Sequence, residues 1–194
     1  MSGYHHTTST ENLPLEHLNP VFTPENMAEV QVIIKRYPEG KQKSAVLPIL
    51  HIAQKQWQWL SSPVMDYVAG ILGILPIEVY EVATFYTMFH TSPVGNFVLE
   101  VCRTGPCCLL GAEQVIDRIK ERYHIHEGET SADGMFTLKP VECLAACGFA
   151  PVMQIREQYF EQLSVENIDA LLDQLATTDP KTIGYVGNMP IEVK

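Results

Sequence analysis

Two pairs of cysteines constrain more than any other feature how this chain can fold. Four residues separate Cys102 from Cys107, three separate Cys143 from Cys147, and 35 residues lie between the two pairs. Only the tertiary fold can bring such distant pairs together, and four converging thiolates are the ligand set of a metal centre. Structural zinc sites more often use cysteines two residues apart, and this sequence has no Cys-x2-Cys pair. The spacing therefore favours a 2Fe–2S cluster over zinc.

The remaining cysteine, Cys108, directly follows one of these four. All five cysteines lie between positions 102 and 147, and such an odd, clustered set is not typical of a secreted disulfide scaffold. Because Cys108 is adjacent to Cys107, its side chain should point away from the metal centre. We expect a small buried apolar residue there, with a fifth-ligand or ligand-swap role as the alternative.

Composition and charge exclude several classes of protein. The 194 residues, 46% of them hydrophobic, are enough for one large globular domain or two small ones. A formal net charge of −10, with no basic stripe, disfavours binding to nucleic acid or to an anionic membrane surface. No apolar run reaches the roughly 18 residues that span a bilayer. The first Lys or Arg is Lys35, so neither a signal peptide nor an arginine-rich transit peptide is predicted, and we expect a cytoplasmic protein.

Changes in residue pattern divide the chain into four stretches. The first is polar and unpatterned and is interpreted as a flexible arm, the second is rich in helical patterns, the third alternates strand and helix patterns, and the fourth is a loose tail. Their predicted boundaries are 1–20, 21–93, 94–176 and 177–194.

The second stretch predicts a small bundle of four helices. Start signals are a capping hydroxyl or a proline, and stop signals are glycine or proline. The helices are expected from Pro24 to about Tyr37, Lys43 to Trp57, Ser62 to Gly73 and Ile77 to about Phe89. The last of these is apolar on most sides, so it is either central in the bundle or covered by a partner protein.

The third stretch predicts a small α/β domain in the order β-α-β-β-α, an order that resembles a thioredoxin-like domain. Alternating residues indicate strands, and an apolar stripe with a Ser164 cap indicates the last helix. The elements are expected at 97–102, 109–123, 136–142, 152–155 with 159–160, and after Ser164. Both cysteine pairs then follow the ends of strands.

The residues around the cysteines should tune a bound cluster. The helix after Cys107 is expected to direct its positive N-terminal end toward the cluster. Backbone N–H groups near Thr104, Gly105, Ala145 and Ala146 are candidate donors to sulfur. Arg103 either offsets the negative charge of the cluster or is simply solvated. A reduction potential on the order of a few hundred millivolts negative is typical of this cluster type.

Motifs beyond the cysteines give the chain a specific resemblance. With the spacing Cys102-x4-Cys107 and Cys143-x3-Cys147, they resemble the small thioredoxin-like 2Fe–2S subunit of respiratory complex I over about residues 20–175. The matching segments are Phe22-Thr23-Pro24-Glu25-Asn26, Tyr37-Pro38-Glu39-Gly40, the run from Val79 to Phe89, Phe136-Thr137-Leu138, Glu142-Cys143-Leu144 and Ala150-Pro151.

The resemblance implies a fold, a cofactor and partners. It implies an α+β chain, in which a helical bundle precedes a thioredoxin-like domain that carries one 2Fe–2S cluster on Cys102, Cys107, Cys143 and Cys147. It also implies assembly with the NADH-binding flavoprotein subunit, which holds FMN and NADH, in a larger respiratory complex peripheral to the inner membrane. The cluster then exchanges single electrons with FMN. This chain alone has no catalytic pocket, because the sequence contains neither Gly-x-Gly-x-x-Gly nor a P-loop.

Two departures and two alternatives accompany the resemblance. The family often has Gly where this chain has Ala145, and three threonines where it has Arg103-Thr104-Gly105. Neither departure removes a ligand.

Related chains serve as diaphorase subunits of NAD-linked hydrogenases and formate dehydrogenases, and the sequence separates these assemblies poorly. An alternative of a different class is a zinc-stabilised interaction module without a redox role.

Overall fold

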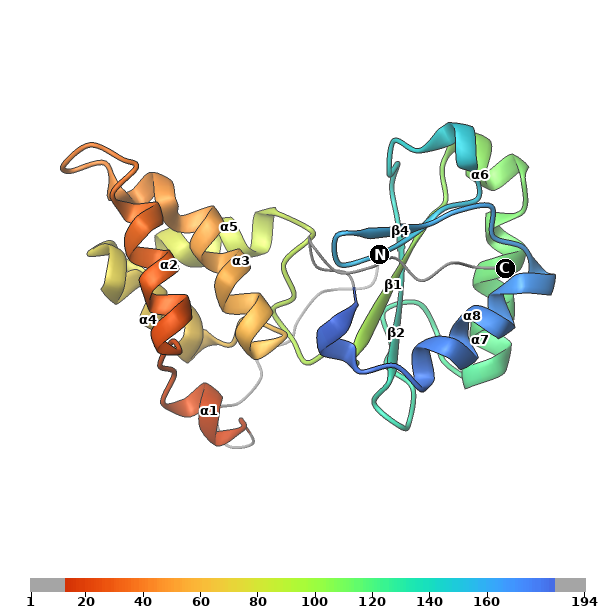
Figure 1. The fold of residues 1–194 in the computed structure, drawn as a ribbon, viewed down its shortest axis with the longest axis horizontal. Coiled ribbons are helices and arrows are strands. Elements are labelled where there is room, and N and C mark those ends of the chain that lie inside the picture. The colour runs from red at the N-terminus through yellow and green to blue at the C-terminus, as the bar shows by residue number, and fades with distance from the viewer. Residues whose placement is uncertain (1–12, 184–194) are drawn as a thin grey trace. The chain divides into compact units, whose positions relative to one another are not determined.

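The chain divides between Pro93 and Val94 into two compact units, shown as ribbons in Figure 1. The structure, a computed structural model, describes residues 13–183. The first unit is helical and the second combines helices with a four-stranded sheet. Each unit has its own hydrophobic core, so each is described by itself.

The first unit contains the four expected helices and one short helix before them. Its elements are α1 (Leu15–Leu18), α2 (Pro24–Ile34), the 3-10 turn η2 (Gln42–Ala45), α3 (Val46–Trp57), α4 (Ser62–Leu72) and α5 (Pro76–Phe85). The predicted start of α2 is confirmed, because the Thr23 side chain accepts a hydrogen bond from the Asn26 N–H at 3.2 Å. Gly73 ends α4 in the left-handed conformation, with φ of 64°.

The predicted end of the fourth helix is wrong. We expected α5 to continue to about Phe89, but it ends at Phe85 because Tyr86 has extended backbone, with φ of −88° and ψ of 114°. Leaving the helix lets Phe89 turn back into the core, where its ring lies 5.0 Å from that of His51. Burial of this large aromatic ring stabilises the early end of the helix.

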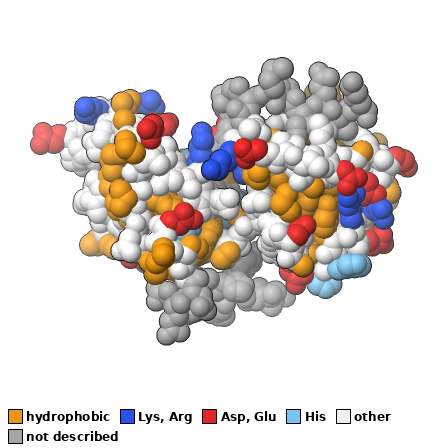
Figure 2. Space-filling model, turned by 60° about the horizontal axis from the view of Figure 1, so that its bottom comes forward, with side chains coloured by type: hydrophobic (Ala, Val, Ile, Leu, Met, Phe, Trp, Pro, Cys, Tyr) orange, Lys and Arg blue, Asp and Glu red, His pale blue; other side chains and the backbone are white. Residues whose placement is uncertain are grey.

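One face of α5 packs in the core and the other faces outward. Val79 and Ala83 are buried, whereas Ile77 is 55% exposed and Phe85 77%, and Leu75, just before the helix, is 66% exposed. The interpretation of α5 as a central helix therefore holds for one face only. Figure 2 shows hydrophobic side chains gathered in patches on the visible face of both units.

The prediction that residues 1–20 lack structure is wrong for α1. His17 of this helix is buried, its ring stacks on Trp59 at a centroid distance of 4.5 Å, and its Nδ1 lies 3.0 Å from Ser61 Oγ. A four-residue helix is not stable by itself in water, so these contacts with a distant segment hold it in place. The local sequence contains no sign of them.

Burial of His17 predicts a dependence of stability on pH. Burial lowers the pKa of this imidazole from 6.5, although the Trp57 backbone and Glu16 oppose the shift. Between pH 6.5 and the lower pKa of the folded state, the unfolded chain binds a proton that the folded chain excludes. The free energy of unfolding should therefore fall as pH falls, by at most about 1.4 kcal/mol per pH unit.

Urea unfolding followed by tryptophan fluorescence tests this prediction, since both tryptophans, Trp57 and Trp59, lie in the first unit. His17→Phe keeps an aromatic ring against Trp59 but binds no proton. On going from about pH 7.5 to about pH 5.5, the wild-type protein should lose more stability than this variant. Equal losses would contradict the prediction.

The second unit is built on one mixed sheet. Its strands are β1 (Phe97–Cys102), β2 (Phe136–Val141), β3 (Met153–Ile155) and β4 (Gln158–Phe160), in the order β2-β1-β3-β4. The first two strands are parallel, and the other two adjacent pairs are antiparallel. Its helices are α6 (Gly105–Leu109), α7 (Ala112–Tyr123) and α8 (Val165–Ala176), with 3-10 turns η3 (Cys147–Phe149) and η4 (Pro180–Thr182). The predicted strands, hairpin and last helix occur in the expected order, but two helices, α6 and α7, stand where one was expected.

Residues after α8 are more ordered than expected. We predicted a loose tail over residues 177–194, and this is wrong for the part up to Ile183. Ile183 is buried in the core of the second unit, and its carbonyl accepts a hydrogen bond from Arg156 at 2.7 Å. Arg156 also donates to the carbonyls of Asn96, at 3.0 Å, and of Pro180. The remaining residues of the tail lie outside the described part of the chain.

Within residues 13–183, no helix combines the length and the apolar character that crossing a bilayer requires.

Candidate metal centre

The parallel pairing of β1 and β2 brings the two cysteine loops to the same end of the sheet. Cys102 is the last residue of β1 and pairs with Val141, the last residue of β2. Cys143 therefore follows just beyond β2, and Cys147 begins η3. α6, which contains Cys107, and η3 contact each other beyond this end of the sheet, and Figure 1 shows α6 at the top of the second unit. Two pairs distant in sequence thus become neighbours.

The two pairs differ in exposure. Cys102 is 3% exposed and Cys107 2%, and they share a small apolar cluster with Val152. Cys143 and Cys147 are exposed. The structure brings the thiols of Cys102 and Cys107 into contact and places Cys147 near Cys107. In the described part of the chain, however, no three His, Cys, Asp or Glu side chains converge on a position for a single metal ion. The set of four ligands stays a prediction.

Backbone N–H groups are directed at three of the four sulfurs. The N–H groups of Thr104 and Leu144 lie where they lower the pKa of Cys102, and that of Val152 lies where it opposes the rise in the pKa of Cys107. Ala145 N–H donates to Cys143 Sγ at 3.3 Å. Such donors are typical of sites that stabilise anionic sulfur in metal clusters.

The expected donors near Thr104 and Ala145 are therefore found, whereas those of Gly105 and Ala146 stay predictions. Sequence reasoning missed Leu144 and Val152. Each of these two faces a cysteine of the first pair from a segment that is distant along the chain. No local pattern marks such a contact.

The buried pair of thiols has opposite pKa shifts. Burial raises the pKa of Cys107 to about 11, and the hydrogen bond with Cys102 adds to the shift. Burial acts on Cys102 in the same direction, but the N–H groups of Thr104 and Leu144 outweigh it and lower the pKa of Cys102. Cys102 is therefore the first of the two to ionise. Metal ligation requires both thiolates, so it would release the proton held by Cys107.

Two expectations about the segment after Cys107 are wrong. We predicted that Cys108 is buried, but it is exposed, because successive residues of α6 point in directions about 100° apart. We also predicted that one helix begins after Cys107 and runs to Tyr123. Instead, Gly111, with φ of 106°, separates α6 from α7, so Cys107 lies inside a short helix.

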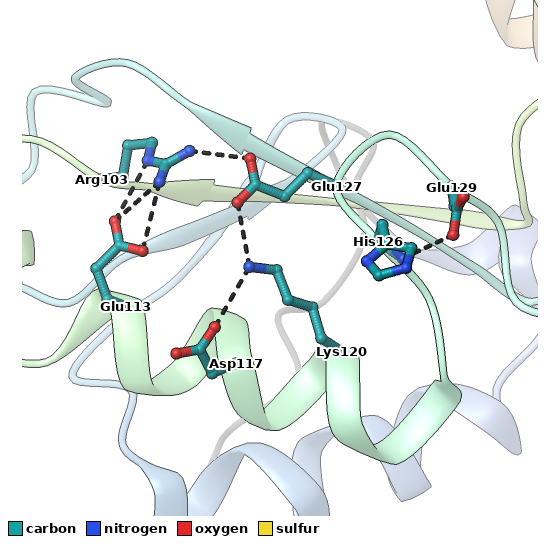
Figure 3. Close-up of polar contacts among 7 residues, drawn as sticks. All are labelled: Arg103, Glu113, Asp117, Lys120, His126, Glu127 and Glu129. Atoms are coloured by element: carbon teal, nitrogen blue, oxygen red, sulfur yellow. Dashed lines mark hydrogen bonds and ion pairs between the residues drawn. The ribbon is translucent and has the colours of Figure 1, made fainter.

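Arg103 belongs to a network of ion pairs, drawn in Figure 3. Its guanidinium lies 3.3 Å from Glu113 and 3.0 Å from Glu127, and Lys120 lies 3.2 Å from the other oxygen of Glu127. Arg103 is thus neither simply solvated nor a free positive charge beside the cysteines, because two carboxylates compensate it. Each such partly exposed pair contributes only about 0.2–1 kcal/mol.

Ala145 has a backbone conformation that favours glycine. Its φ is 59°, in the left-handed region, where the Cβ of an L-residue crowds the following carbonyl. The resemblance drawn from the sequence places Gly at this position, and the structure supplies the physical reason.

Replacing Ala145 with glycine should therefore stabilise the protein. Removing the left-handed strain raises the free energy of unfolding by about 1–2 kcal/mol. The greater conformational freedom of glycine in the unfolded chain lowers it by about 0.5–1 kcal/mol. A net increase of about 1 kcal/mol in the free energy of unfolding is expected from urea titration. Ala146→Gly is the matched control, because Ala146 has a φ of −110° and should gain nothing. A similar gain in both variants would contradict the explanation.

The mixed sheet with both cysteine loops at one end is the arrangement expected of a thioredoxin-like domain with a cysteine-ligated centre, and comparison with known proteins names the family. Residues 30–176 match the family described as thioredoxin-like 2Fe-2S ferredoxin. The chain belongs to this family, and the predicted fold class is confirmed.

Relatives within the family carry more specific names. One is NADH dehydrogenase (ubiquinone) flavoprotein 2, mitochondrial, of Dictyostelium discoideum, 43% identical over 170 residues that cover 87% of this chain and 69% of the relative. Another is an NADH-quinone oxidoreductase subunit of Rhizobium meliloti (strain 1021), 44% identical over 154 residues that cover 79% of this chain and 90% of the relative. The predicted resemblance to the small 2Fe–2S subunit of complex I is confirmed.

A solved structure shares the fold. A chain in the crystal structure of an NAD+-reducing NiFe-hydrogenase in the air-oxidized state superposes with a TM-score of 0.61 over 68% of this chain and 22% of that chain. The sequences are 20% identical, so this likeness concerns the fold alone.

Proposed function

We propose that this chain is the electron-transfer subunit of an NADH:quinone oxidoreductase and that it holds one 2Fe–2S cluster. One observation carries the proposal. Two cysteine pairs follow the same ends of two paired parallel strands, in a chain that is 44% identical to an NADH-quinone oxidoreductase subunit over 79% of its length. The oxidoreductase activity is then a property of the assembly.

The proposed ligands are Cys102, Cys107, Cys143 and Cys147. The residues of this site fit an iron–sulfur cluster, because the available donors are thiols and because backbone N–H groups already point at three of the sulfurs. Cys108 is left out, since it is an exposed side chain on α6 next to a buried one. When bound, such a cluster accepts and returns one electron.

FMN and NADH are proposed to bind the partner flavoprotein rather than this chain. The sequence contains neither the glycine-rich turn of a dinucleotide site nor a P-loop. The cluster then exchanges single electrons with FMN of that partner. A cytoplasmic location, peripheral to the inner membrane through the complex, follows from the same assignment.

Metal analysis and spectroscopy of anaerobically purified protein test the cofactor. Iron and acid-labile sulfide in equal amounts are expected, together with a paramagnetic signal after chemical reduction. A colourless protein that holds zinc would replace the proposal with a zinc-stabilised module.

Co-purification tests the assembly. A tagged chain should isolate an FMN-containing NADH-binding subunit together with other components of a quinone-reducing complex. Recovery of a hydrogenase or formate dehydrogenase large subunit instead would keep the cluster but reassign the parent enzyme.

A further inference from the structure

A tyrosine outside both cysteine loops is bonded to the second loop. The hydroxyl of Tyr159, on β4, donates a hydrogen bond to the carbonyl oxygen of Leu144 at 2.7 Å. The ring is 43% exposed, so the residue contributes little to the core. Its one polar atom contacts the segment between Cys143 and Cys147.

The carbonyl that Tyr159 holds belongs to the same peptide group as a donor to sulfur. The C=O of Leu144 and the N–H of Ala145 form one planar trans unit, so fixing the oxygen fixes the direction of the N–H. That N–H donates to Cys143 Sγ at 3.3 Å. Two hydrogen bonds in series therefore run from the Tyr159 hydroxyl through one peptide group to a cysteine sulfur.

The peptide group between Cys143 and Leu144 also faces a cysteine of the proposed centre. The N–H of Leu144 faces Cys102 and helps to lower the pKa of its thiol. The two peptide groups that flank Leu144 thus face one sulfur of each pair, and Tyr159 is the side chain that holds the Leu144 carbonyl. The left-handed backbone of Ala145, with φ of 59°, is the kind of conformation that persists only when its surroundings hold it.

We propose that Tyr159 is a positioning residue for the cluster, which aims the Ala145 N–H at the sulfur of Cys143 and thereby raises the reduction potential. The inference rests on the proposed function, because it requires that Cys143 is a ligand. Reduction adds negative charge that is shared by the sulfurs, so an N–H donor stabilises the reduced form more than the oxidised form. The hydroxyl also polarises the peptide group and strengthens its N–H as a donor.

Tyr159→Phe removes the hydroxyl and keeps the ring. In a redox titration followed by electron paramagnetic resonance, the variant should have a more negative midpoint potential than the wild type. Weakening one hydrogen bond by about 0.7 kcal/mol lowers the ratio of reduced to oxidised cluster about threefold at fixed potential, which corresponds to about 28 mV. Tyr123→Phe, which removes a hydroxyl from α7 in the same unit, is the matched control and should leave the potential unchanged.

Hydrogen exchange supplies a second measurement that needs no cluster. In the cluster-free protein, the Ala145 amide should exchange faster in Tyr159→Phe than in the wild type. A variant with an intact cluster and a wild-type potential would overturn the role of Tyr159 and leave the proposed function standing. Wild-type protein without iron would overturn the proposed function itself. A potential that shifts equally in Tyr159→Phe and Tyr123→Phe would also overturn the inference.

Discussion

Serine in place of Cys102 is expected to abolish the cluster. Cys102 ends β1 and is buried. Backbone N–H groups from both cysteine loops lower the pKa of its thiol, so they favour the thiolate that a metal ligand requires. A serine hydroxyl is harder to ionise and is a harder ligand than sulfur. Changing an outer partner of a metal ligand already costs about 10–100-fold in affinity, so loss of a ligand should reduce bound iron by at least about tenfold. Iron and sulfide analysis, with the visible spectrum, measures the loss.

Cys108→Ser is the matched control for this experiment. Cys108 lies on α6 beside a proposed ligand, but its side chain is exposed. The variant should keep its iron and its spectrum. If Cys108→Ser lost the cluster while Cys107→Ser kept it, the assignment of the first pair would be wrong by one residue.

Alanine in place of Phe136 is expected to destabilise the second unit strongly. Phe136 is fully buried at the start of β2, where its ring lies 5.9 Å from that of Phe97 and 4.9 Å from that of Tyr123. Replacing a buried phenylalanine with alanine removes apolar contact and leaves a cavity, at a cost of about 3–5 kcal/mol. Because β2 leads to Cys143, a loosened strand should also weaken cluster retention.

Far-UV circular dichroism during urea unfolding measures this effect on the whole chain. Tryptophan fluorescence follows the first unit alone, because Trp57 and Trp59 both lie there. The dichroism transition should move to lower urea, and the fluorescence transition should stay in place. Phe149→Ala is the control, since this ring is 51% exposed and its removal should cost well under 1 kcal/mol. Equal losses in both variants would contradict the cavity argument.

Much of the fold was predictable because its signals are local. Thr23 and Ser164 cap the helices that follow them, and the alternation of β1 is confirmed as a strand. A cap, a proline or a period of two acts within a few residues of the chain, so the sequence records it directly. The spacing within each cysteine pair is also local, and the shared centre that it predicts stays a prediction.

Several of the errors occur where a contact with a distant segment outweighs local preference. Helix α1 depends on stacking of His17 against Trp59, and α5 stops early so that Phe89 is buried. One of the two partners of Arg103 was likewise unpredictable, because Glu127 is 24 residues away and is brought close by the path of the chain after α7. None of these contacts leaves a periodic pattern in the sequence.

The sequence by itself predicted an iron–sulfur centre and its thiol ligands, and it determined the order of the strands and most of the helices, since these follow from residue type and spacing. The tertiary structure decided which backbone N–H groups meet the sulfurs, which cysteines are buried, and that Tyr159 holds the peptide group between Leu144 and Ala145. The physical reason is that hydrogen bonds and burial depend on distance in space. The parallel pairing of β1 with β2 sets those distances around the cysteine loops.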